Sequence, residues 1–137
     1  MADKLTPERR SANMAKIRAK HTKPEMLVRR MVHGMGFRYR LHRKDLPGKP
    51  DLVFGPRRKV IFVHGCFWHL HDCRAGRIPS SRRNYWEPKL LRNVERDAEH
   101  LAALRGAGWQ VLTIWECETK DLAALENRLA EFLKAAE

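Results

Sequence analysis

Residues 51–73 read DLVFGPRRKVIFVHGCFWHLHDC, and this stretch decides how the rest of the chain is interpreted. Two apolar runs, residues 51–54 and 59–64, flank Gly-Pro-Arg-Arg, a sequence typical of a turn, so they predict two paired strands. The second run leads into residues 64–73, which hold three of the seven histidines and two of the three cysteines. A strand core needs no such mixture of ligand and aromatic residues. The mixture predicts a metal site at a strand end, beside aromatic side chains that form a contact surface for a flat partner.

The pattern outside this stretch predicts one α/β domain with a mixed central sheet. A helix is expected to begin near Thr22 and to end at Gly34 or Gly36, and residues 37–42, which end with His42, alternate as in a half-buried strand. Residues 65–87 are expected to form an irregular excursion. The remaining elements are a helix with apolar positions from Leu90 to Leu101, a strand over 109–115 and a last helix over 122–132. We expect an arm over 1–21 and a single domain over 22–137.

The composition favours a soluble, cytoplasmic protein. The chain of 137 residues is long enough for one domain with a real core. It contains no apolar run near the roughly 18 residues that span a bilayer, and residues 1–20 lack the apolar core of a signal peptide. Three cysteines without an export signal favour thiolate ligands or free thiols over disulfides.

The positive charge is concentrated in the first part of the chain. Residues 1–60 hold 17 of the 28 Lys and Arg residues but only five of the 16 Asp and Glu residues, so they carry the entire net charge of +12. Phosphate neutralisation by a nucleic acid explains this asymmetry. An anionic membrane is the alternative, but no strongly amphipathic basic helix stands out. The arm itself fits either a DNA-gripping segment or a passive tail.

The cysteines and one histidine provide a complete set of zinc ligands. Three sulfurs and one nitrogen suit a tetrahedral structural site, and Cys117 follows a strand that can lie beside residues 59–64. The alternatives are three buried free thiols, or His69 in place of His71 as the nitrogen ligand. The proposed set is Cys66, His71, Cys73 and Cys117.

A second group of residues suits phosphate chemistry. Asp51 begins one predicted strand and His64 ends the next, and polar residues at strand ends often converge on a site. A carboxylate can hold Mg²⁺, and a histidine such as His64 or His69 can accept a proton. Asp97 could orient one of these imidazoles. Seen alone, Asp51 fits a turn or cap residue, and Glu25 fits a residue that complements the dipole of its helix.

Four aromatic residues flank the excursion. Phe67, Trp68, Tyr85 and Trp86 fit either a miniature core or wedges that unstack DNA bases. Four arginines lie between the two pairs and favour a nucleic-acid surface. They are Arg74, Arg77, Arg82 and Arg83.

Nearly the whole chain resembles the very short patch repair (Vsr) endonucleases. The resemblance is carried by Arg-Ser-x-Asn-Met at residues 10–14, residues 50–54 and 61–73, Asn-Val-Glu-Arg-Asp at 93–97, and residues 108–117. It implies a restriction-endonuclease-like fold. It also implies an enzyme that nicks one strand 5′ to the thymine of a T:G mismatch left by deamination of 5-methylcytosine.

The resemblance assigns roles to individual residues. It implies that Asp51 and the backbone carbonyl of Val63 bind magnesium, with two ions in the site, and that His69 is the general base with Asp97 as its partner. His64 matches a second catalytic histidine, and Glu25 matches an active-site glutamate, in contrast to the dipole reading.

The other implied roles concern zinc and DNA. The resemblance gives zinc the four ligands already named, and places Phe67, Trp68 and Trp86 beside the mismatch and Met14 and Ile17 in the minor groove. The expected partners are double-stranded DNA with a T:G mismatch and mismatch-repair proteins, for a nucleoid-associated monomer that binds no membrane. The alternatives are a zinc-stabilised DNA-binding module without catalysis, or a restriction endonuclease of the same fold.

Overall fold

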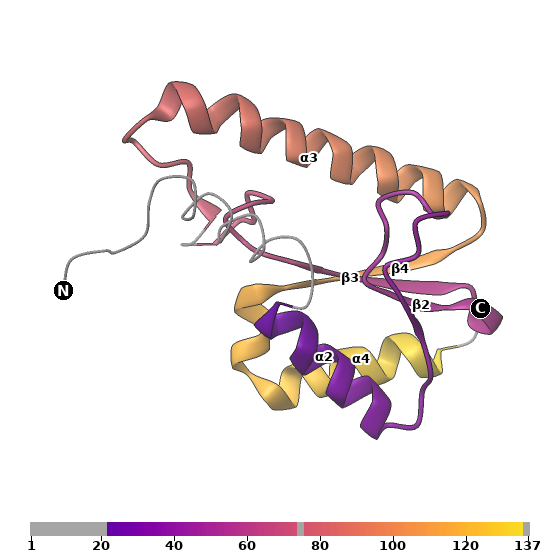
Figure 1. The fold of residues 1–137 in the computed structure, drawn as a ribbon. Helices are drawn as coiled ribbons and strands as arrows, with labels where there is room; N and C mark the ends of the chain where they lie inside the picture. The colour runs from indigo at the N-terminus through magenta and orange to yellow at the C-terminus, as the bar shows by residue number, and fades with distance from the viewer. Residues whose placement is uncertain (1–21, 74–75, 136–137) are drawn as a thin grey trace, which may run out of the picture.

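The computed structural model describes residues 22–73 and 76–135, which form a mixed sheet covered by helices on both faces. The sheet contains β1 (Arg40–Leu41), β2 (Leu52–Phe54), β3 (Lys59–His64) and β4 (Gln110–Trp115), in the order β1-β2-β3-β4. β1, β2 and β3 pair antiparallel, whereas β3 and β4 pair parallel. Figure 1 shows α3 (Arg83–Gly106) over one face, and α2 (Lys23–Gly34) and α4 (Leu122–Lys134) over the other.

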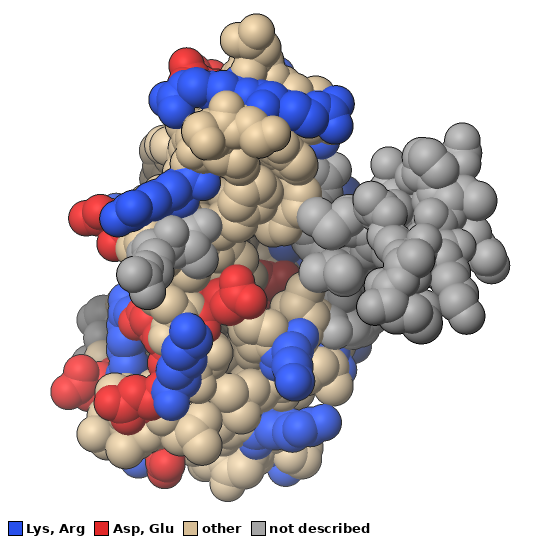
Figure 2. Space-filling model, turned by 90° about the vertical axis from the view of Figure 1, so that its left-hand side faces the viewer, with Lys and Arg blue, Asp and Glu red and all other residues tan. Residues whose placement is uncertain are grey.

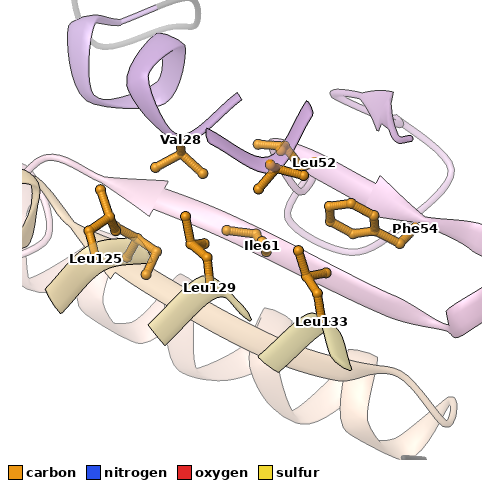
Figure 3. Packing of buried hydrophobic residues seen from close by; sticks show 9 residues of the cluster. Val28, Leu52, Phe54, Ile61, Leu125, Leu129 and Leu133 are labelled. Atoms are coloured by element: carbon orange, nitrogen blue, oxygen red, sulfur yellow. The ribbon is translucent and has the colours of Figure 1, made fainter. Parts of the chain in front are cut away.

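Two core clusters fill the space on the two faces of the sheet. Leu52, Phe54 and Ile61 belong to the larger cluster with α2 and α4, as Figure 3 shows. The residues that alternate with them, including Val53 and Val60, belong to a second cluster with Leu104 of α3 and Trp109. Because successive strand side chains point to opposite faces, this alternation explains why β2 and β3 read as continuous apolar runs.

Two polar contacts fix the helices that flank the sheet. The hydroxyl of Thr22 accepts the backbone N–H of Glu25 at 3.4 Å and so caps α2 where the sequence predicts its start. Lys59 of β3 is only 1% exposed, and its Nζ donates to the carbonyls of Phe132 and Ala135 at 2.7 and 2.6 Å. This lysine therefore satisfies carbonyls that the end of α4 leaves without helical partners.

The predicted α/β class, the mixed sheet and the order of elements are confirmed, but three boundaries differ. Burial alternates over residues 37–41 as expected, yet only Arg40 and Leu41 pair with β2. A 3-10 helix, η3 (Glu116–Lys120), follows β4 and carries Cys117. Finally, α3 already begins at Arg83, so the end of the predicted excursion is helical.

The sequence lacks the usual signals for the point at which α3 begins. Its N-cap residue, Arg82, has a left-handed backbone and provides no side-chain cap, so the usual start signal is missing. Pro88 lies inside the helix, where a proline removes a backbone hydrogen bond, whereas proline usually marks a helix start. Both features hide the true start of α3 from a reading of the sequence.

The described part of the chain contains no helix with the length and apolar character that a membrane span needs. The predicted arm, with Met14 and Ile17, lies outside the described residues.

Candidate active site and metal centre

The predicted site residues meet at one edge of the sheet. β3 ends at His64, opposite Trp115 at the end of β4, while β2 begins at Leu52, directly after Asp51. Antiparallel pairing brings the start of β2 to this edge, and parallel pairing brings the end of β4 there. As a result, residues that are more than sixty positions apart in the chain converge around the end of β3.

Asp51 is held by the backbone of β3. Its Oδ2 accepts the N–H of Val63 at 2.7 Å, and the side chain is 17% exposed. Burial raises the pKa of Asp51 to about 7; the Val63 hydrogen bond opposes this shift and the charge of Glu25 adds to it. A carboxylate that is buried beside a second carboxylate favours a bound cation, because the cation offsets the negative charge. The oxygen donors also suit a hard ion such as Mg²⁺.

Glu25 of α2 lies close to Asp51, and His42, for which the sequence predicted no role, contacts both side chains. His42 Nε2 lies 2.9 Å from Glu25 Oε2 and 3.8 Å from Asp51 Oδ1. One donor atom from each of the three side chains lies within 4.8 Å of the others. The sequence placed His42 only at the end of an alternating segment, and the turn that brings it to Glu25 could not be read from spacing.

The two predicted catalytic histidines stack on each other. Their rings lie 3.8 Å apart with 6° between planes, and His69 Nδ1 lies 2.6 Å from Asp97 Oδ2. This contact fixes the ring of His69 and leaves Nε2 as its second nitrogen for proton transfer. Burial lowers the pKa of His64 to about 4, and the charge of His69 lowers it further while Asp97 opposes the shift. His64 is therefore neutral near pH 7.

All of these groups except Glu25 line one cleft of about 630 Å³ that also contains cationic side chains. Its lining includes Asp51, Val63, His64, His69 and Asp97. Lys44, Lys49 and Arg96 add positive charge that the sequence analysis did not assign to the site. Figure 2 views the end of the molecule where α3 begins, with Lys and Arg over both its upper and lower parts and acidic side chains near its middle and lower left. A cleft of this composition suits a phosphate-bearing substrate.

The predicted zinc ligands also come together. The donor atoms of Cys66, His71, Cys73 and Cys117 all lie within 4.8 Å of one another. His71 Nδ1 lies 3.7 Å from the sulfur of Cys66 and 3.5 Å from that of Cys117. Ordinary zinc–sulfur and zinc–nitrogen bonds give a tetrahedral edge of about 3.5 Å, so the set fits a four-coordinate zinc ion. His69 Nδ1 lies beside Asp97 Oδ2 instead, so of the two histidines it is His71 that lies with the three sulfurs.

The surroundings of the sulfur cluster affect the pKa of Cys66 and hold the excursion in place. Burial, followed by contacts with neighbouring thiols, raises the pKa of Cys66 to about 12, although the backbone N–H of Cys117 donates to its sulfur. Such thiols favour a cation, which stabilises their ionised form. A Cβ added to Gly76 would lie 1.9 Å from the carbonyl oxygen of His71, so the loop closes only with glycine there. Asn93 of α3 donates to the carbonyl of Trp68 at 2.9 Å and ties the excursion to the helix.

The aromatic residues form a group of their own. Phe67, Trp68 and Trp86 contact one another edge to face, with ring centroids 5.0 to 5.8 Å apart. All three are half-buried, Tyr85 is 48% exposed, and none of the four belongs to either core cluster. They are thus separate from the main core, and two of them, Phe67 and Trp68, lie between His64 and His69 in the sequence.

Comparisons with known proteins agree with this arrangement. A family described as DNA mismatch endonuclease Vsr matches residues 2–75. A type II nicking enzyme from Xanthomonas oryzae is 55% identical over 97% of this chain and 98% of its own length. One from Neisseria meningitidis is 42% identical over 98% and 96%. The DNA mismatch endonuclease Vsr of Escherichia coli is 38% identical over 97% of this chain and 88% of its own.

The fold, the cleft and these relatives together define an endodeoxyribonuclease, a hydrolase that acts on DNA. The chain belongs to the Vsr family of DNA mismatch endonucleases and related nicking enzymes, as the sequence resemblance indicated.

Proposed function

We propose that this enzyme nicks one strand of duplex DNA 5′ to the thymine of a T:G mismatch and so begins very short patch repair. The observation that carries the proposal is the single cleft that joins Asp51 to the His64, His69 and Asp97 group and to cationic side chains. The name of the Escherichia coli relative, DNA mismatch endonuclease Vsr, supports action at a mismatch. The relatives from Xanthomonas and Neisseria are named as nicking enzymes, which supports cleavage of one strand.

The residues at the start of β2 and the end of β3 are proposed to hold the catalytic cation. Asp51 and the carbonyl of Val63 are the proposed protein ligands of Mg²⁺, with two ions in the site, and Glu25 is the nearby second carboxylate. When bound, Mg²⁺ neutralises charge on the scissile phosphate and on the leaving oxygen. Fixing both carboxylates before the substrate arrives reduces the reorganisation that the reaction needs.

The histidine pair is proposed to manage the proton. His69 accepts a proton from the attacking water, and Asp97 stabilises the imidazolium that results because it lies 2.6 Å from Nδ1. His64 remains neutral because its pKa is about 4, so it serves as a hydrogen-bond partner of the phosphate rather than as a second cation. This division separates the base from the group that steadies the reacting phosphate.

The remaining parts are proposed to hold and deform DNA. Zinc bound by Cys66, His71, Cys73 and Cys117 keeps the excursion in one conformation, which supports the aromatic group. Phe67, Trp68 and Trp86 then act as wedges beside the mismatch, and residues 1–21, including Met14 and Ile17, grip the minor groove. We further propose a nucleoid-associated monomer that works with mismatch-repair proteins.

A strand-specific nicking assay tests the proposal. Duplexes with randomised flanking pairs carry T:G, C:G or T:A at one fixed position, and each strand has its own end label. With Mg²⁺, we expect a single nick 5′ to the thymine of T:G and far slower cleavage of the two matched duplexes. Equal cleavage of both strands in a matched duplex would instead identify a restriction endonuclease and contradict the proposal.

A further inference from the structure

His42 contacts both carboxylates of the proposed cation site, Glu25 on α2 and Asp51 directly before β2. It follows β1 directly, has a left-handed backbone with φ of 47°, and donates its N–H to the carbonyl oxygen of Asp51 at 3.2 Å. This backbone geometry turns the chain at the sheet edge. The imidazole then lies beside Glu25 of α2 and beside the side chain of Asp51.

The contact distances indicate what the ring does. Nε2 lies 2.9 Å from Glu25 Oε2, which is a hydrogen-bond distance, and 3.8 Å from Asp51 Oδ1. A carboxylate accepts hydrogen bonds, so Nε2 carries the proton and donates to Glu25. Glu25 is only 2% exposed, and Arg29 lies further away, at 3.6 Å. Of these two contacts of the Glu25 carboxylate, the one with His42 is therefore the shorter.

We propose that His42 is a positioning residue, which acts through Glu25 by holding its carboxylate in a fixed orientation beside Asp51. This inference rests on the proposed function, because it assumes that Glu25 and Asp51 form the acidic part of the catalytic site. One carboxylate oxygen of Glu25 lies within 4.8 Å of one of Asp51, so their negative charges repel, and the N–H of His42 beside both offsets this repulsion. Without His42, the carboxylate of Glu25 turns away and the site loses its preformed arrangement.

The competing explanation is a purely structural link between α2 and the sheet. His42→Ala removes both roles, whereas His42→Gln retains an amide N–H at a similar reach from the backbone. Both substitutions place a non-glycine residue at the same positive φ, so they share that backbone strain. His33→Ala is the matched control, since His33 is an exposed histidine on α2 whose backbone carbonyl, not its ring, accepts from Arg38.

The first experiment is single-turnover nicking of the T:G duplex, with melting temperatures of all variants measured alongside. We expect His42→Ala to slow nicking about 10–100-fold, as is typical when a residue that orients a metal-site ligand is lost. His42→Gln should recover most of the rate, and His33→Ala should match the wild type. In the Glu25→Gln background, adding His42→Ala should slow nicking far less, because the two residues act through one contact.

A second readout needs no activity and no magnesium. Long-range ¹H–¹⁵N spectra of the Mg²⁺-free protein should show the His42 ring with its proton on Nε2, and Glu25→Gln should shift that nitrogen signal. A wild type that does not nick T:G removes the proposed function, yet these spectra still test the bond. Wild-type nicking by His42→Ala, an equal loss in both backgrounds, or an Nε2 signal without a proton overturns the positioning role.

Discussion

Two donor sets of different chemistry meet near the end of β3. One consists of carboxylates and imidazoles, most of which line an open cleft, and the other of three sulfurs and one nitrogen. The sulfur set already has the four ligands of a closed tetrahedral site, which leaves no place for a substrate. The oxygen set adjoins a cleft with Lys44, Lys49 and Arg96. Under the proposed function, one strand end therefore supports both a structural centre and a reactive centre, which differ in closure as much as in ligand type.

The largest effect is expected from breaking the closed site. Cys117→Ser removes one ligand and leaves the other thiols with no complete set, and binding of structural zinc contributes many kcal/mol to folding. We expect the variant to lose stoichiometric zinc and to melt more than about 10 °C lower, since this corresponds to a few kcal/mol for a domain of this size. Metal analysis and thermal melting measure both effects. Lys120→Ala, an exposed change in the same η3, is the control, and a zinc-free wild type with unchanged stability would refute the structural role.

The next effect separates the open site from the closed one. His69→Ala should keep zinc and fold normally but slow single-turnover nicking by roughly 10²–10⁴-fold, the usual contribution of a general base. Asp97→Asn should slow it less, and the double variant should be no worse than His69→Ala because Asp97 acts through that ring. Glu99→Gln, an exposed change on α3, serves as the control. Additive losses for the two residues would show that they do not work as one unit.

These two site descriptions differ in how far the sequence predicted them. The sulfur set was readable because the chain contains only three cysteines, which restricts the choice of ligands despite the distance from Cys73 to Cys117. The Asp51 and His64 pair followed from strand ends. His42 was missed because its contact with Glu25 depends on a left-handed turn after β1. The start of α3 was missed because it has no side-chain cap, and η3 was missed because Glu118, which accepts the N–H of Trp115, is its main local signal.

A smaller effect should appear in the stability of the Mg²⁺-free protein. The pKa of Asp51 is about 7 when folded, above its usual value near 3.8, so protonation of Asp51 favours the folded state. This stabilisation is complete below the lower value and is lost as the pH rises through the higher one. Asp51→Asn should therefore exceed wild-type stability by a margin that grows with pH, with an upper limit of roughly 4 kcal/mol.

Denaturant unfolding at several pH values, with zinc retained, measures this margin. Asp45→Asn is the matched control, because Asp45 is exposed and its hydrogen bond with Arg43 lowers its pKa instead. A constant difference between Asp51→Asn and the wild type across the range would mean that burial of this carboxylate does not oppose folding.

The smallest effect concerns the aromatic group. Trp68 is half-buried outside both core clusters, so Trp68→Ala should reduce stability less than Ile61→Ala, for which a buried aliphatic truncation typically costs about 2–5 kcal/mol. If Trp68 is a wedge, its loss should nevertheless weaken nicking of the T:G duplex by roughly 10-fold or more, in line with the cost of about 1–3 kcal/mol for losing one base-stacking contact. Unfolding curves and nicking rates provide the comparison. Stability that falls as far as in Ile61→Ala, with nicking by the folded fraction unchanged, would identify Trp68 as core.

The central claim is that the open cleft at the end of β3 is the reactive centre. Single-turnover nicking by Asp51→Asn, measured together with binding to the same T:G duplex, tests it most directly. The substitution keeps the size of the side chain and removes the charge proposed to hold the cation. We predict that nicking is abolished while DNA binding and the zinc content stay at wild-type levels. Nicking at the wild-type rate would contradict the account and show that Asp51 is not part of the chemistry.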